Sequence, residues 1–146
     1  MKNENEVFEL SRNFALRIIK MYKFLVNDKK EFVMSKQILR SGTSIGANIA
    51  ESQAAFSKKD FLAKMYISFK ECTETLYWLE LLFEAEYLTK EQYDSLYKDA
   101  ERIRKILSAI TKSTRENLET DTDEKIFFQF LIPNSSSLIP NFSPLF

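Results

Sequence analysis

The absence of proline from the first 132 residues constrains the fold of this chain more than any other feature of its sequence. The three prolines come later, as Pro133, Pro140 and Pro144. Proline removes a backbone donor and breaks helix interiors, so a long stretch without it favours helices wherever apolar residues recur at helical spacing. The two glycines lie one turn apart inside such a segment rather than in a turn. We therefore predict an all-α fold.

Four segments show the apolar spacing of amphipathic helices, at about residues 5–27, 32–55, 57–86 and 89–119. Ser57 with Asp60, and Thr89 with Gln92, are capping boxes that begin the third and fourth segments. Both of these segments repeat apolar residues at heptad spacing, which is typical of a bundle seam. Because the turns between segments are short, the sequence predicts an up-down-up-down antiparallel four-helix bundle over residues 1–119.

Residues 120–146 differ in composition and are predicted to form an irregular C-terminal tail. Phe127, Phe128 and Phe130 stand close together there, and serines and prolines follow them. Two interpretations remain open. Either a short strand-like or helical piece docks these aromatic side chains on the bundle, or the tail is mobile and its exposed aromatic residues favour association.

The composition limits the classes of function. Basic and acidic residues are balanced at 21 each, so charge alone does not predict a nucleic-acid partner. The chain has no histidine, which removes the usual metal ligand and the commonest general base. Cys72 is the single cysteine, lies on an apolar seam and is compatible with a reducing cytoplasm. We therefore expect no enzymatic activity, no cofactor, no metal and no membrane span.

The most distinctive stretch is Gln37–Glu51 in the second segment. Gly42 and Gly46 each cost about 1 kcal/mol relative to alanine in a helix interior, which suggests that a neighbouring helix packs closely there. The alternative is that both simply replace alanines at a tolerable cost. A polar stripe follows the other side of the same helix and consists of Arg40, Ser44, Asn48 and Glu51.

This polar stripe is the best candidate site in the sequence. Buried polar groups need hydrogen-bond partners, so the stripe predicts pairing with a complementary helix. Glu71 and Glu74 are candidate partners for Arg40, within one chain or between chains. Trp78 is predicted to fill a groove between subunits, because aromatic residues are enriched at interfaces. The alternatives are a solvated outer face and a surface that contacts a ligand or nucleic acid.

A second candidate surface is basic. Repeated around a ring, weak phosphate contacts gain strength by avidity. The alternative is a solvated face that nearby acids balance. The residues are Arg12, Arg17, Lys20 and Lys23 in the first segment, with Arg102, Arg104 and Lys105 in the fourth.

Several stretches resemble the four-helix bundle proteins first noticed as reading frames in intervening sequences of bacterial 23S rRNA genes. The resemblance covers about residues 6–118 and is carried by Gln37–Ser41, Ser44–Ile45, Asn48–Glu51, Asp60–Phe61 and Lys70–Leu82. It implies an all-α subunit that assembles into a ring, a homopentamer. The accessory variability determinant proteins of diversity-generating retroelements look like distant relatives, and they are basic pentameric barrels that bind nucleic acid.

The resemblance implies a non-enzymatic ring with a nucleic-acid-binding or accessory role. The neutral charge of this chain departs from the basic relatives. The alternative function is a protein–protein interaction scaffold that binds no nucleic acid.

Overall fold

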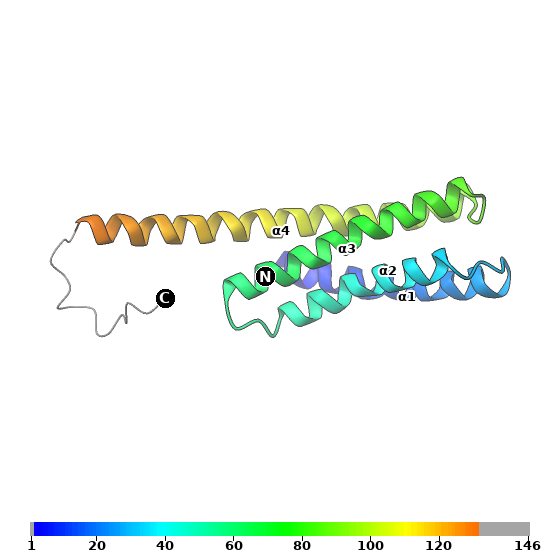
Figure 1. Cartoon of the computed structure of the whole chain (residues 1–146), viewed down its shortest axis with the longest axis horizontal. Helices are drawn as coiled ribbons and strands as arrows, with labels where there is room; N and C mark the ends of the chain where they lie inside the picture. Colours follow the sequence, from blue (N-terminus) through cyan, green and yellow to red (C-terminus); the bar gives the residue numbers. More distant parts are fainter. Residues whose placement is uncertain (1, 132–146) are drawn as a thin grey trace.

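Four antiparallel helices form the part of the chain that the computed structural model describes, residues 2–131. They are α1 (Lys2–Asn27), α2 (Met34–Ser52), α3 (Lys58–Glu84) and α4 (Lys90–Leu131), and they lie lengthwise beside one another (Figure 1). Helices α1 and α3 each contact α2 and α4. The predicted all-α, up-down-up-down bundle is therefore confirmed.

The core follows the apolar stripes of the sequence. In α1 the buried residues recur at three- and four-residue spacing, which places them on one helical face. Burying a large apolar side chain contributes about 1.5–3 kcal/mol, so these faces hold the bundle together. The largest fully buried side chains include Phe14, Ile18 and Leu25 in α1, Ile38, Ile45 and Ile49 in α2, Met65 and Leu79 in α3, and Ile103 and Leu107 in α4.

Small hydroxyl side chains, as well as apolar ones, fill the contact between α2 and α3. Ser68 is fully buried, and its Oγ donates a hydrogen bond to the carbonyl of Ile45 at 2.8 Å. The hydroxyls of Thr75 and Ser41 are also buried and lie 3.0 Å apart. Apolar spacing does not reveal these positions, because it counts only apolar residues. Their hydrogen bonds join the two helices in the interior.

Helices α3 and α4 begin at the predicted caps, whereas α2 begins at a cap that was not predicted. The backbone N–H of Asp60 donates to Ser57 Oγ at 3.0 Å, and Thr89 and Gln92 make the reciprocal bonds of a capping box at 3.0 and 3.2 Å. At the start of α2 the carboxylate of Glu31 accepts three backbone bonds, from residues 33, 34 and 35, at 3.0, 2.9 and 2.6 Å. Helix α2 begins after this cap, at Met34, and ends at Ser52, so it is shorter at both ends than the predicted 32–55.

Helix α4 is much longer than predicted. Its expected end near residue 119 is wrong, because the helix continues to Leu131 and extends past the other three helices (Figure 1). The loss of apolar spacing marks the end of core contact, whereas no proline or glycine stops the helix before Pro133. The salt bridge between Lys58 Nζ and Asp121, 3.1 Å long, ties this part of α4 to the start of α3.

Phe127 and Phe130 of this extension do not dock on the bundle. Phe127 and Phe130 are 65% and 80% exposed. The side chain of Phe128 and residues 132–146, the rest of the predicted tail, lie outside the described residues. Residues 120–131 therefore belong to α4 rather than to an irregular tail.

Candidate interaction surfaces

The two glycines of α2 lie against α1 of the same chain. A Cβ atom on Gly42 would lie 2.9 Å from Cγ1 of Ile18, and one on Gly46 would lie 3.3 Å from Oγ of Ser11. Contacts below 3.0 Å require something to move, so Ile18 leaves less room beside Gly42 than Ser11 leaves beside Gly46. The glycine side of Gln37–Glu51 thus packs within the chain.

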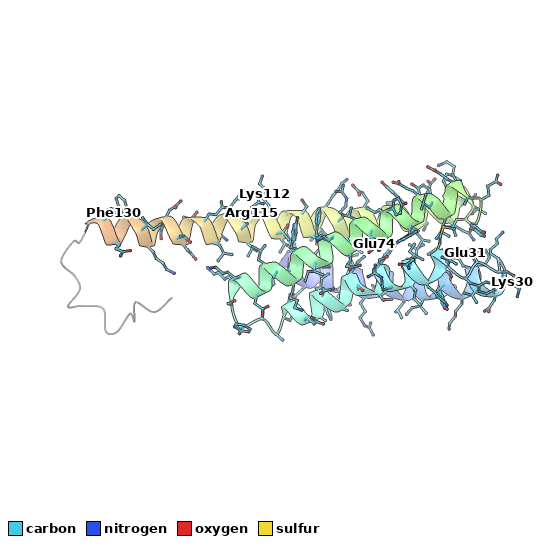
Figure 2. All side chains as sticks on the ribbon, viewed as in Figure 1. Lys30, Glu31, Glu74, Lys112, Arg115 and Phe130 are labelled. Carbon is cyan, nitrogen blue, oxygen red and sulfur yellow. The ribbon has the colours of Figure 1, made fainter. Side chains whose placement is uncertain are left out.

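Arg40 lies on the opposite side of α2 and binds two carboxylates of α3. Its Nη1 lies 3.3 Å from Oε2 of Glu71, and its Nη2 donates to Glu74. Trp78 Nε1 donates to the second oxygen of Glu74 at 3.3 Å. The hydrogen bond from Arg40 holds the pKa of Glu74 below its usual value and raises the pKa of Arg40 in turn. We call Arg40, Glu71, Glu74 and Trp78 the arginine cluster; Glu74 is labelled in Figure 2.

The other members of the polar stripe mostly bond within their own helix. Ser44 Oγ donates to the carbonyl of Arg40 at 2.6 Å, and Asn48 Nδ2 donates to the carbonyl of Ser44 at 2.9 Å. Glu51 reaches α3 instead, through a 2.6 Å salt bridge with Lys64. Lys64 was not among the residues predicted from the sequence, although it lies seven residues before Glu71 and so shares its helical face. Only the two ends of the stripe therefore connect α2 to α3.

Apolar and aromatic side chains lie close to the arginine cluster. The rings of Tyr77 and Trp78 meet edge to face at a centroid distance of 5.1 Å. Tyr77 is 53% exposed and Ile67 is 40% exposed, while Trp78 is half-buried. Arginine, tyrosine and tryptophan are the residue types enriched at protein interfaces. We call this surface, the arginine cluster with Ile67 and Tyr77, the α2–α3 face.

The predicted phosphate contacts divide into two groups. Three arginines are engaged by carboxylates of the same chain, which reduces their availability to a phosphate. The remaining four, Arg12, Lys20, Lys23 and Lys105, are exposed and have no ion pair among the described residues. The three pairs are Arg17–Asp99, Arg102–Glu6 at 2.7 Å and Arg104–Glu101 at 2.7 Å.

Cys72 is a core residue, as predicted. It is fully buried, and its Sγ lies 3.2 Å from the carbonyl oxygen of Ala100. Burial raises the pKa of the thiol to about 12. Within residues 2–131, no group of three or more cysteine or carboxylate side chains is placed to hold a metal ion. No helix in this part of the chain is long and apolar enough to cross a membrane.

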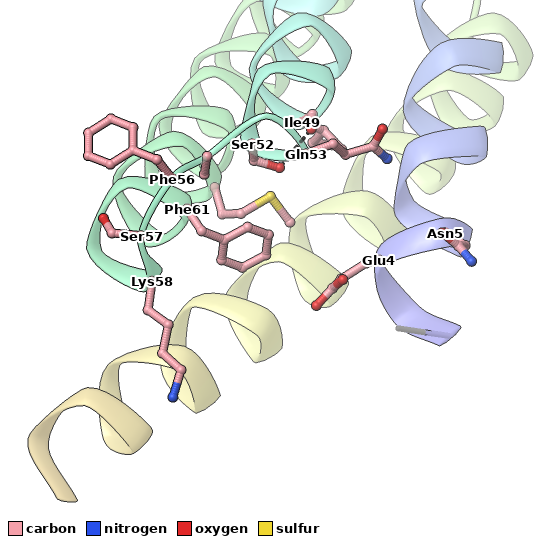
Figure 3. A pocket seen from close by; sticks show the side chains of 11 residues that line it. Glu4, Asn5, Ile49, Ser52, Gln53, Phe56, Ser57, Lys58 and Phe61 are labelled. Atoms are coloured by element: carbon pink, nitrogen blue, oxygen red, sulfur yellow. Dashed lines mark hydrogen bonds between the residues drawn. The ribbon is translucent and has the colours of Figure 1, made fainter. Parts of the chain in front are cut away.

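A pocket of about 680 Å³ opens at the end of the bundle where α1 begins, α2 ends and α3 begins (Figure 3). Ile49, Phe61 and Met65 give it an apolar lining, and Glu4 and Lys58 add one charge of each sign. Phe56 belongs to the connecting loop and is 92% exposed. Asn5, Ser52, Gln53 and Ser57 also line the pocket, so its wall mixes apolar and polar side chains.

A family model described as 23S rRNA-intervening sequence protein matches residues 3–109. The chain belongs to this family. A crystal structure of a protein with unknown function from the S23 ribosomal protein family of Bacteroides thetaiotaomicron is 57% identical to it, with a TM-score of 0.74. That match covers 75% of this chain and 98% of the Bacteroides chain. No curated protein matches.

Membership of the 23S rRNA-intervening sequence family confirms the resemblance seen in the sequence. The matched residues include the arginine cluster and both glycines but end inside α4. The remainder of α4, residues 110–131, lies beyond the family model.

Proposed function

We propose that this family member is a non-enzymatic interaction protein that assembles with copies of itself into a ring, a homopentamer by family resemblance. The α2–α3 face supplies part of the contact between subunits. The arginine cluster carries this proposal, because it is a half-exposed arrangement of Arg40, two carboxylates and Trp78 beside exposed apolar residues.

Three physical features suit this face to binding a protein. Arg40 is 51% exposed yet held by Glu71 and Glu74, so less side-chain entropy is lost when a partner covers it. Tyr77 and Trp78 offer rigid aromatic surface, which often dominates binding energy at interfaces. One guanidinium faces two carboxylates in the cluster, so a partner that places a cation beside Glu71 complements its charge.

Native mass spectrometry of the full chain at micromolar concentration tests the assembly. We expect a closed multiple of the subunit mass for the wild type. Tyr77→Asp adds a charge to the α2–α3 face at an exposed position outside the core, and we expect it to give monomers. Phe56→Asp is the matched control, since it adds the same charge at a residue that is even more exposed but lies in the loop between α2 and α3.

A wild-type monomer contradicts the proposal. Equal loss of assembly in Tyr77→Asp and Phe56→Asp contradicts the assignment to this face. Circular dichroism melts of all three proteins establish that the variants remain folded.

Nucleic-acid binding is the second candidate function. The observation in its favour is the group of exposed cations without ion pairs in the described part of the chain: Arg12, Lys20, Lys23 and Lys105. Phosphate contacts release counterions, so we expect affinity in a gel-shift assay with RNA and DNA to fall steeply between low and physiological salt.

The matched variants are Lys20→Glu with Lys23→Glu, and Lys90→Glu as a control, because Lys90 already pairs with Asp94 at 2.7 Å. We expect only the double variant to abolish the shift. The absence of a shift for the wild type at low salt rejects this function and favours the scaffold without nucleic acid.

A further inference from the structure

The outer side of α4 carries a stripe whose charge changes along its length. Successive members are three, four or seven residues apart, so they share one helical face. The stripe begins basic with Lys105 and Lys112, becomes acidic at Glu116 and Asp123, and ends apolar at Ile126 and Phe130. All six residues are exposed.

In the described part of the chain, the charged residues of this stripe form no ion pair and its apolar residues stay exposed. Its four charged members make no ion pair with any residue in 2–131, whereas Asp121 on the inner side of α4 does. Ile126 is 47% exposed and Phe130 is 80% exposed. Figure 2 shows Phe130 on the part of α4 that extends past the other helices, with Lys112 and Arg115 nearer the bundle. Exposed apolar groups beside complementary charges are typical of a binding surface.

We propose that the stripe binds the same stripe of a second copy of the chain, with the two α4 helices antiparallel. Reversing the direction places the basic half of each helix opposite the acidic half of the other. When Lys112 lies opposite Glu116, Lys105 lies opposite Asp123. A two-fold axis repeats both pairs, so each contact occurs twice.

This register also accommodates the apolar end of the stripe. Ile126 lies opposite Arg102, whose guanidinium pairs with Glu6, and Phe130 lies opposite Lys98. The aliphatic stems of these two basic side chains can cover apolar surface. Both basic residues are exposed in the single chain. A shift of one heptad toward the C-terminal ends of the helices places Glu116 opposite Glu119, and the repulsion between like charges disfavours it. The opposite shift keeps unlike charges facing each other but places Phe130 opposite the charged Glu91.

The acidic half of the stripe favours a protein partner over nucleic acid. Glu116, Glu119 and Asp123 are exposed along the same face and repel a phosphate backbone. The acidic and apolar parts also lie beyond residue 109, where the family model ends. The pairing uses the outer side of α4, whereas the ring proposed above uses the α2–α3 face. The two contacts therefore involve different faces of the bundle.

Sedimentation equilibrium of the full-length Tyr77→Asp chain at low salt tests the pairing, because that variant removes the α2–α3 contact. We expect a monomer–dimer equilibrium. Lys105→Glu alone and Asp123→Lys alone each raise its dissociation constant about tenfold or more, and the two together restore it to within about threefold. Lys20→Glu makes the same charge change on α1 and leaves the constant unchanged.

Phe130→Ser tests the apolar part, with Phe56→Ser as its control. We expect weaker pairing only for Phe130→Ser. Three results would each overturn the proposal. The Tyr77→Asp chain could stay monomeric, Lys105→Glu and Lys20→Glu could have equal effects, or the charge-swapped double variant could fail to pair. A Lys105→Glu effect confined to oligonucleotide binding overturns it in favour of nucleic acid. Failure of the ring leaves this result unaffected, because the ring is absent from the experiment.

Discussion

Ile18 of α1 occupies the space that a side chain on Gly42 of α2 would need. A Cβ atom added to Gly42 would lie 2.9 and 3.0 Å from the two γ carbons of Ile18, both of which are held in the buried core. At Gly46, one turn later, the nearest atom is the Ser11 hydroxyl oxygen at 3.3 Å. The two glycines therefore differ in how much they can change.

Gly42→Ala is expected to destabilise the protein by up to about 2 kcal/mol. Overpacking costs about 1–3 kcal/mol, and alanine returns about 1 kcal/mol of helix propensity. Gly46→Ala meets a milder contact and is expected to be stabilising by less than about 1 kcal/mol. Urea denaturation followed by circular dichroism measures both. A more stable Gly42→Ala protein contradicts the close approach of α1 and α2.

Glu31→Gln is expected to destabilise the protein by about 1–2 kcal/mol at neutral pH, because it weakens three hydrogen bonds at the start of α2. Burial works against ionisation of Glu31, but the backbone donors outweigh it and hold its pKa below the usual value. The difference between wild type and variant is therefore present above the unfolded pKa of about 4.3. It disappears as pH falls through the lower folded pKa.

Thermal melts of both proteins from neutral to acidic pH measure this difference. Glu9→Gln is the control, because Glu9 is exposed and lies in α1 away from either helix end. A constant gap between wild type and Glu31→Gln across the whole range contradicts the capping role of the carboxylate.

Cys72 is expected to be inert in the folded protein. Its thiol is fully buried, and burial raises its pKa to about 12, so little thiolate exists at pH values near 8. A coloured thiol reagent should react at the rate at which the protein unfolds and much faster in concentrated urea. Rapid stoichiometric reaction with the native protein would show that the α3–α4 contact opens easily.

The hydroxyls of Ser41 and Thr75 are expected to be energetically coupled. Thr75→Val and Ser41→Ala each break a buried contact between α2 and α3, at about 1 kcal/mol. The double variant removes both hydroxyls of this pair, so neither is left without its partner. Its destabilisation should therefore be smaller than the sum of the two single-variant effects. A double-mutant cycle from urea denaturation measures the coupling, and strict additivity counts against a direct bond.

Most of the fold was predictable because helices depend on local sequence. The capping residues Ser57 and Thr89 satisfy backbone donors a few residues away, so they are recognisable without tertiary information. The cap on α2 was not predicted, because Glu31 lies in the preceding turn rather than at the N-cap position, which Val33 occupies. The end of α4 was missed because apolar spacing reports contact with the core rather than helix continuity.

The candidate surfaces were only partly predictable. Glu71 and Glu74 were correctly named as partners of Arg40, since all three are charged and lie on neighbouring helices. Whether they meet within one chain or between chains depends on the rotation of α2 relative to α3. The outer stripe of α4 could not be found either, because its last three members, Asp123, Ile126 and Phe130, were placed in an irregular tail.

The sequence by itself determined the helical body, the antiparallel order and the apolar stripes, because hydrogen bonds within a helix and helical periodicity are local properties. Only the tertiary structure decided that Gly42 and Gly46 face α1, that Arg40 is paired within its own chain, and that hydroxyls line the contact between α2 and α3. These features depend on how far apart two helices lie and how each is rotated about its axis. Both are set by the packing of all four helices at once.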